Sequence, residues 1–320
     1  MLPRWHNLLS SHQIYKIIGF GFASKSASSS SSLAQLRKAT GHPFGFCREA
    51  LSVCDGDYDR AFVWLQNEAT KRGMAKAEKL KSRPMTQGLL GMISSPRCVA
   101  VVEVNCETDF VARNQDFQSL VSSSAESLFE HLLKANQPGT HTFLEEDLKT
   151  IPNVVGSQKQ TIGELLANVI GSLGENMAIP RGIGMTISGD KANEISHLIA
   201  YCHMSNAGIK KGFRNVVFGK YIAVLRYRHL NNQKGSAAWQ EQASRLTQQL
   251  CQHIVGMKPY RTLSLDAIPQ AENPDEEKCL LRQPFLFDES VAVGTLLEQN
   301  EILVEDFVRV ECGVEEEEEE

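Results

Sequence analysis

The stretch Val99-Ala-Val-Val-Glu-Val-Asn105 is followed directly by Cys106-Glu-Thr-Asp-Phe-Val-Ala-Arg113, and the chemistry of the chain changes at that junction. The first part is a β-branched apolar run between polar residues, which predicts a strand. Beyond it, apolar side chains recur at helical spacings, at Phe117, Leu120, Val121, Leu128 and Leu132, which predicts a helix. Thr108 or Asp109 is the expected N-cap, because either side-chain oxygen can accept N–H groups of the first turn.

Two interpretations of this turn remain open. In the first, Asp109 only caps the helix and Phe110 is an ordinary core residue. In the second, the junction of strand and helix presents an acid and an aromatic ring side by side at the end of a domain, where another molecule can contact them.

The composition predicts a globular protein of two or three domains. The chain has 320 residues, 42% of them hydrophobic, and a formal net charge of −5. No apolar stretch approaches the roughly 20 residues of a membrane-spanning helix, so no membrane is expected as a partner. Glutamates occupy positions 315–320, which predicts a solvated, disordered tail, and the mild charge does not indicate nucleic acid as the main partner.

The N-terminal segment is basic, rich in serine and free of acidic residues. The first acidic residue of the chain is Glu49. This pattern predicts a mitochondrial transit peptide over residues 1–32 and a location in the mitochondrial matrix. A secretory signal is a weaker alternative, because lysine interrupts the apolar residues 14–22, and a disordered cytosolic leader is another.

Neither metal binding nor covalent catalysis is indicated. The eight cysteines form no C-x-x-C pair, which favours free buried thiols over zinc ligands or disulfides. Gly219-Lys220 is followed by Tyr221, where a phosphate-binding loop needs Ser or Thr. Glu107 and Asp109 are better explained as capping or solvated groups than as paired catalytic carboxylates. We therefore expect no catalytic residues, no metal and no cofactor.

Residues 33–71 predict three short helices. Gly41 ends the first, and Gly56-Asp57 supplies a C-cap and an N-cap between the second and third. This pattern resembles the ubiquitin-associated three-helix fold. Residues 68–83 carry six lysines and arginines and predict an exposed helix and linker, with RNA binding as a minor possibility.

Beyond residue 85 the pattern predicts an α+β architecture of antiparallel sheets with packed helices. Strands are expected at 89–93 and 98–104, which form a hairpin, and at 177–187, 195–203, 221–226 and 302–310. Helices are expected at 162–173, 239–255 and 291–299. Pro180 should lie at an edge or at a strand start, because it cannot donate to the ladder. The halves before and after residue 189 read as two related subdomains, each a sheet with helices.

The string Glu103-Val-Asn-Cys-Glu-Thr-Asp-Phe-Val111 resembles the signature of the elongation factor Ts family. Further segments that resemble the family are 171–177, 199–203, 218–221, 252–257, 283–286 and 304–312. The segments 252–257 and 304–312 are similar to the animal mitochondrial branch. One departure is Met204, where the family usually has glycine after the residue that aligns with His203.

This resemblance implies a guanine-nucleotide exchange factor for mitochondrial elongation factor Tu, bound as a one-to-one heterodimer. It implies that Thr108, Asp109, Phe110 and Val111 enter the GTPase near its Mg²⁺ site, with weaker contacts from Phe44, His203 and Arg181. Phe44 is preferred over Phe46 as a contact, and the alternative for His203 is a satisfied sheet histidine. An adaptor of the ubiquitin-associated type and an RNA-binding protein remain the competing functions.

The expected organisation therefore has six parts. They are a transit peptide (1–32), a ubiquitin-associated-like module (33–71), a basic linker (72–84), a first subdomain (85–189), a second subdomain (190–313) and an acidic tail (314–320).

Overall fold

The computed structural model describes residues 29–156, 160–188, 196–203, 212–213, 215–230 and 237–314. Most of the expected leader, most of the loop 204–215 and the glutamates 315–320 lie outside these ranges. The chain divides into two compact units, residues 1–65 and 66–320. In the described part, no helix is long and apolar enough to cross a membrane. All eight cysteines are free thiols.

The first unit contains the helices α1 (Ser29–Thr40) and α2 (Phe44–Val53) and the start of α3 (Tyr58–Leu80). Their small core consists of Leu36, Cys47, Ala50, Cys54, Ala61 and Leu65. Gly41 and Gly56 both have positive φ, as expected for C-cap glycines. The Asp57 carboxylate accepts the N–H of Arg60 at 2.9 Å, which confirms its capping role.

The third helix is longer than expected, because the helix predicted in the basic segment continues it. Helix α3 runs without a break for 23 residues. Within the second unit it packs closely on α7 (Ile162–Leu173). Glycine at position 73 allows this approach, because a side chain there would collide with the carbonyl oxygen of Ala167. Lys76 Nζ donates to the carbonyl oxygen of Gly171 at 3.1 Å. Gly73 and Lys76 therefore lie on the side of this segment that packs on α7, whereas Lys71, Arg72 and Lys79 are exposed, as expected.

The second unit contains a seven-stranded antiparallel sheet with the order β3-β5-β2-β1-β8-β7, and β4 also pairs with β2. The strands are β1 (Gln87–Ser94), β2 (Cys98–Cys106), β3 (Gly139–Leu144), β4 (Met177–Ala178), β5 (Arg181–Thr186), β7 (Gly212–Phe213) and β8 (Val216–Gly219). The predicted hairpin of β1 and β2 is present, with Ser94 opposite Val99.

Two features of this sheet depart from simple expectation. The single strand expected over 177–187 is interrupted, because Pro180 separates β4 from β5 and stands just before a strand start. In addition, β8 follows residue 189 in the chain and yet pairs with β1. The division into subdomains at 189 and 190 stays a prediction, and strands from both of its sides share one sheet.

A second sheet of three strands has the order β12-β9-β6. These strands are β6 (Ser196–His203), β9 (Tyr221–His229) and β12 (Ile302–Glu311). Helices α8 (Ala237–Met257) and α9 (Val293–Gln299) pack on its outer face around Leu250, Ile254 and Phe307. A short hairpin of β10 (Pro284–Phe285) and β11 (Asp288–Ala292) precedes α9, and a 3-10 helix spans Pro274–Glu276.

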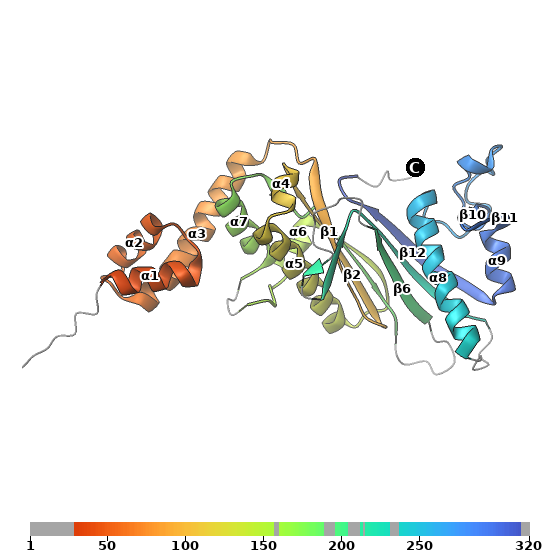
Figure 1. The fold of residues 1–320 in the computed structure, drawn as a ribbon, viewed down its shortest axis with the longest axis horizontal. Helices are drawn as coiled ribbons and strands as arrows, with labels where there is room; N and C mark the ends of the chain where they lie inside the picture. The colour runs from red at the N-terminus through yellow and green to blue at the C-terminus, as the bar shows by residue number, and fades with distance from the viewer. Residues whose placement is uncertain are drawn as a thin grey trace, which may run out of the picture. The chain divides into compact units, whose positions relative to one another are not determined.

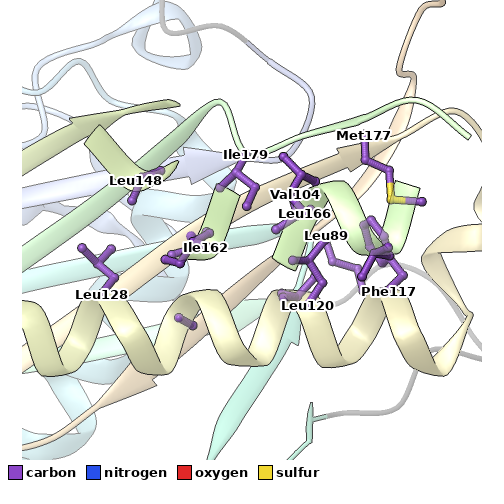
Figure 2. Close-up of a cluster of buried hydrophobic side chains, with 14 of the residues drawn as sticks. Leu89, Val104, Phe117, Leu120, Leu128, Leu148, Ile162, Leu166, Met177 and Ile179 are labelled. Carbon is purple, nitrogen blue, oxygen red and sulfur yellow. The ribbon is translucent and has the colours of Figure 1, made fainter. Parts of the chain in front are cut away.

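The large sheet is covered on both faces. Helices α5 (Gln115–Ala135), α6 (Glu145–Thr150) and α7 pack on one face, and Figure 2 shows Leu120 and Leu128 of α5 among side chains of the sheet and of α7. The three-stranded sheet covers the other face (Figure 1). There Val99 and Val101 belong to the same buried cluster as Val308. Strand β2 is therefore apolar at nearly every position, and the predicted α+β class is correct.

Candidate partner-binding site

The chain leaves β2 at Cys106 and turns at once into α4 (Asp109–Ala112), a helix of four residues. Thr108 is its N-cap, because Thr108 Oγ1 accepts the N–H of Val111 at 3.3 Å. The expectation of one continuous helix from this cap is wrong. Asn114 is the N-cap of a second helix, α5, and its side chain accepts the N–H of Asp116 at 2.7 Å. This second cap divides the expected helix into α4 and α5.

Phe110 projects from this turn into solvent. It is 79% exposed, the largest exposed fraction among the exposed large hydrophobic side chains of the described residues. The interpretation of Phe110 as a core residue is therefore wrong. The next two residues, Val111 and Ala112, are buried and belong to the main core, so the same short helix buries one side and presents the other.

Asp109 lies beside Phe110 and forms an ion pair with Arg113, with 2.9 Å between the carboxylate and the guanidinium. Both side chains are a little less than half exposed, at 46% for Arg113 and 44% for Asp109. Exposed pairs of this kind contribute little to stability, typically less than about 1 kcal/mol, so a partner can replace either member. The 108–111 loop thus offers one ring and one carboxylate that the fold does not need for its own core.

Hydrogen bonds join the loop to the turn that follows α7. The N–H and the hydroxyl of Thr108 both donate to the Glu175 carboxylate, at 3.1 and 2.8 Å. In return the N–H of Asn176 donates to the Glu107 carboxylate at 2.5 Å. These reciprocal, charge-assisted bonds join two segments that are far apart in the sequence.

Gly174 determines where this turn lies. It ends α7 with a φ of +80°, a conformation that glycine adopts without strain, and its N–H donates to the carbonyl oxygen of Ile170 at 2.9 Å. Glu175 and Asn176 follow directly. Sequence reasoning did not include Glu107, Glu175 or Asn176 in the site, and the only available signal was the resemblance of residues 171–177 to the family.

Cys106 supports the loop from within the core. Its buried thiol donates to the carbonyl oxygen of Thr108 at 3.2 Å. Burial, followed by the nearby Glu175 carboxylate, raises the pKa of this thiol to about 12. Cys106 therefore stays protonated at neutral pH and acts as a hydrogen-bond donor.

His203 lies at the same end of the two sheets as the loop. It is the last residue of β6 and is exposed, with Nδ1 3.1 Å from the hydroxyl of Tyr201. Its carbonyl oxygen accepts the N–H of Lys220 at 2.9 Å, and Lys220 Nζ donates to the carbonyl oxygen of Gly88 at 2.7 Å. Gly88 lies opposite Asn105, near the end of β2. Lys220 therefore links the strand end that carries His203 to the strands from which the loop emerges.

Arg181 is engaged within the protein. Its guanidinium donates to Glu103 at 2.7 Å and to the carbonyl oxygens of Glu311 and Val314, both at 2.8 Å. The side chains of Arg181 and Glu103 are 13% and 3% exposed. This pairing connects β2 and β5 to the end of β12, and a contact of Arg181 with a partner stays a prediction.

Phe44 belongs to the first unit and begins α2. It is 46% exposed, and the guanidinium of Arg37 lies 4.2 Å above its ring. Phe46 is less exposed and lies edge-on to Trp64 at 6.1 Å. Of these two rings, Phe44 is therefore the more accessible to another molecule.

Comparison with known proteins gives matches over most of the chain. The family model described as "Elongation factor TS" matches residues 107–277, and a model described as "Elongation factor Ts, mitochondrial, N-terminal" matches residues 19–75. The chain is 34% identical to the mitochondrial elongation factor Ts of Aedes aegypti, over 92% of each chain. It is 37% identical to that of Homo sapiens, over 91% of this chain and 85% of the human protein.

Proposed function

Because the chain belongs to the elongation factor Ts family, we propose that it is a guanine-nucleotide exchange factor that binds mitochondrial elongation factor Tu and promotes GDP release during translation elongation. The observation that carries this proposal is Phe110, which is 79% exposed on a helix whose other side is buried. An exposed ring on a fixed backbone is suited to insertion into a pocket of another protein.

The proposed mechanism is displacement of groups in the GTPase. A GTPase holds GDP through phosphate contacts and Mg²⁺, so release requires those contacts to weaken. Phe110 enters a pocket between helices of the GTPase, and Asp109 exchanges its pairing with Arg113 for groups beside the Mg²⁺ site. Burial of a phenyl ring contributes roughly 1.5 to 3 kcal/mol, which is available to offset the displacement.

Reciprocity follows from this mechanism. If the factor weakens the binding of GDP to the GTPase, GDP weakens the binding of the factor to the same extent, because coupling between two ligands is symmetric. Exchange therefore proceeds through a ternary complex of factor, GTPase and nucleotide, and GTP later displaces the factor. The protein acts by binding and does not break or form covalent bonds.

Additional contacts extend the proposed interface beyond the loop. His203 contributes from the same end of the sheets, and Phe44 contributes from the first unit. Arg181 takes part mainly by holding its strand end through Glu103. We propose a one-to-one heterodimer in the mitochondrial matrix, to which residues 1–32 direct the chain.

The decisive experiment measures nucleotide release directly. Elongation factor Tu from mitochondria is loaded with fluorescent GDP and mixed with this protein in a stopped-flow instrument. Acceleration of GDP release that saturates with protein concentration supports the proposal. No acceleration overturns it, and in that case binding assays with ubiquitin and RNA distinguish the two competing functions.

Targeting is tested separately. Residues 1–32 fused to a fluorescent reporter should bring the reporter into mitochondria, because the segment is basic and free of acids. Reporter fluorescence throughout the cytosol would remove the argument for the leader without affecting the exchange proposal.

A further inference from the structure

We propose that Glu175 is a positioning residue for nucleotide exchange, because it holds Thr108 in the orientation that lets α4 present Phe110. This inference rests on the exchange function proposed above. It assigns a role to a residue outside the 108–111 loop that touches neither the nucleotide nor, in our proposal, the GTPase.

Helix α4 is too short to be stable on its own. It contains four residues, and the first turn of a helix fixes several backbone dihedrals for a single hydrogen bond. Phe110 adds nothing to its stability, because that side chain is 79% exposed. The conformation of α4 therefore depends on its N-cap and on the buried Val111 and Ala112.

The cap in turn depends on Glu175. The hydroxyl of Thr108 has one proton and donates it to Glu175 Oε1 at 2.8 Å. An oxygen lone pair is thereby left for the N–H of Val111 at 3.3 Å. The other carboxylate oxygen accepts the N–H of Thr108 at 3.1 Å. The two donors thus face different oxygens of one carboxylate, and a glutamine amide cannot accept at both positions because one of its two terminal groups is a donor.

The carboxylate itself is held on both sides. Gly174 closes α7 directly before it, and Asn176 directly after it donates to Glu107 and to the carbonyl oxygen of Arg83 at 2.8 Å. Glu175 therefore stands on a turn with little freedom to move. Because its carboxylate accepts two hydrogen bonds from Thr108, Glu175 restricts the movement of the N-cap of α4.

The test compares two variants of the full chain with equal loss of charge. Glu175→Gln should lower the maximal rate of GDP release at saturating factor about tenfold, whereas the half-saturating concentration should change much less. Glu164→Gln is the matched control, because Glu164 also accepts a backbone N–H, that of Thr161 at 2.8 Å, in the cap of α7. The control should release GDP at the wild-type rate.

Hydrogen exchange provides a readout of the loop itself. In Glu175→Gln the amide of Val111 should exchange faster than in the wild type, whereas the amides of α5 and β2 should not change. A positioning role also predicts coupling: Thr108→Val removes the hydroxyl, and the double variant should be no slower in GDP release than the slower single variant.

The outcomes separate this inference from the function on which it rests. A wild-type chain that fails to accelerate GDP release overturns both. A wild-type chain that accelerates release, together with a Glu175→Gln variant that matches Glu164→Gln in rate, overturns the positioning role alone. Additive losses in the double variant also overturn it, because they show that Glu175 acts independently of Thr108.

Discussion

At the scale of single residues, the 108–111 loop divides its side chains between two tasks. Thr108 and Val111 join the loop to the protein through a cap and through the core, whereas Asp109 and Phe110 face outward. A side chain that faces outward contributes little to folding, so its effect on a partner can be measured without loss of the fold. The proposal that Phe110 enters a pocket of the GTPase can therefore be tested directly.

Phe110→Ala should reduce the rate of stimulated GDP release about tenfold or more, since losing about 1.4 kcal/mol of differential binding produces that factor. The melting temperature should not change, because the ring is 79% exposed. Stopped-flow exchange and thermal unfolding on the same variant test both statements. Leu133→Ala, which removes an apolar side chain with 44% exposure from α5, is the control and should exchange normally. Normal exchange by Phe110→Ala would exclude Phe110 as the side chain that enters the GTPase.

His253 makes the stability of the second unit depend on pH. This fully buried imidazole accepts the N–H of Leu286 at Nδ1, at 3.1 Å, and its Nε2 lies 2.9 Å from Gln283 Oε1. Burial lowers its pKa below the ordinary 6.5, and the hydrogen bond to Gln283 opposes this only in part. The unfolded chain therefore binds a proton at a higher pH than the folded chain, so stability falls as the pH falls below about 6.5.

In the variant His253→Gln, the free energy of unfolding should depend less on pH than in the wild type. The free energy of unfolding, measured in urea from pH 8 to pH 5, should fall more steeply for the wild type than for the variant. His197 and His229 also have lowered pKa values and are present in both proteins, so they cancel in the comparison. A difference between the two proteins that stays constant with pH would contradict the assignment.

At the scale of elements, close packing of α5 on the large sheet depends on glycines. A Cβ on Gly91 of β1 would lie 2.6 Å from Val121 Cγ1, and one on Gly184 of β5 would lie 2.5 Å from the methyl carbons of Leu132. Both neighbours belong to α5. The glycines therefore let the helix approach the sheet, and the helix in turn fixes Asn114 and the loop before it.

Gly91→Ala should destabilise the second unit by about 1 to 3 kcal/mol, because the added methyl group overpacks a buried interface. Urea unfolding gives the free energy of unfolding for the comparison. Gly256→Ala is the control, since a Cβ there meets only Leu286 at 3.5 Å, and alanine in α8 should stabilise by up to about 1 kcal/mol. Equal stability of Gly91→Ala and the wild type would show that the interface is looser than described.

At the scale of the whole molecule, the cores of the two units do not share residues. Among the residues that the structure describes, the clusters around both sheets contain none before position 66, and the core of the first unit ends at Leu65. A chain that begins at Gln66 should therefore unfold cooperatively, with α3 still packed on α7 from Thr70 onward.

The same truncated chain should bind elongation factor Tu about tenfold more weakly or worse, because it lacks Phe44 and the surface around it. Calorimetric titration gives the affinity, and circular dichroism shows whether the remainder is folded. Phe44→Ala in the full chain should reproduce part of the loss. An unchanged affinity would indicate that the first unit serves a different partner.

Local rules were sufficient where neighbours in the chain decide the structure. The bounds 162–173 of α7 follow from its apolar period and its capping box, and the glycines at 41 and 56 end their helices by backbone conformation alone. The strands predicted at 98–104 and 302–310 from their β-branched runs are present as β2 and β12. Strand β3 and helix α6 were not anticipated, because Leu148 is the only buried residue in either of them and neither shows a clear period.

The sequence by itself determined the α+β class, the position of the junction after β2 and the residues of the 108–111 loop, since these depend on propensity, capping and period over a few neighbours. Only the tertiary structure decided that Phe110 faces solvent, that β8 joins the sheet of β1, and that Glu175 holds Thr108 from 67 residues away. Such pairings bring together groups with no regular spacing in the chain. They are selected by burial and by the need to satisfy polar groups once the whole core has formed.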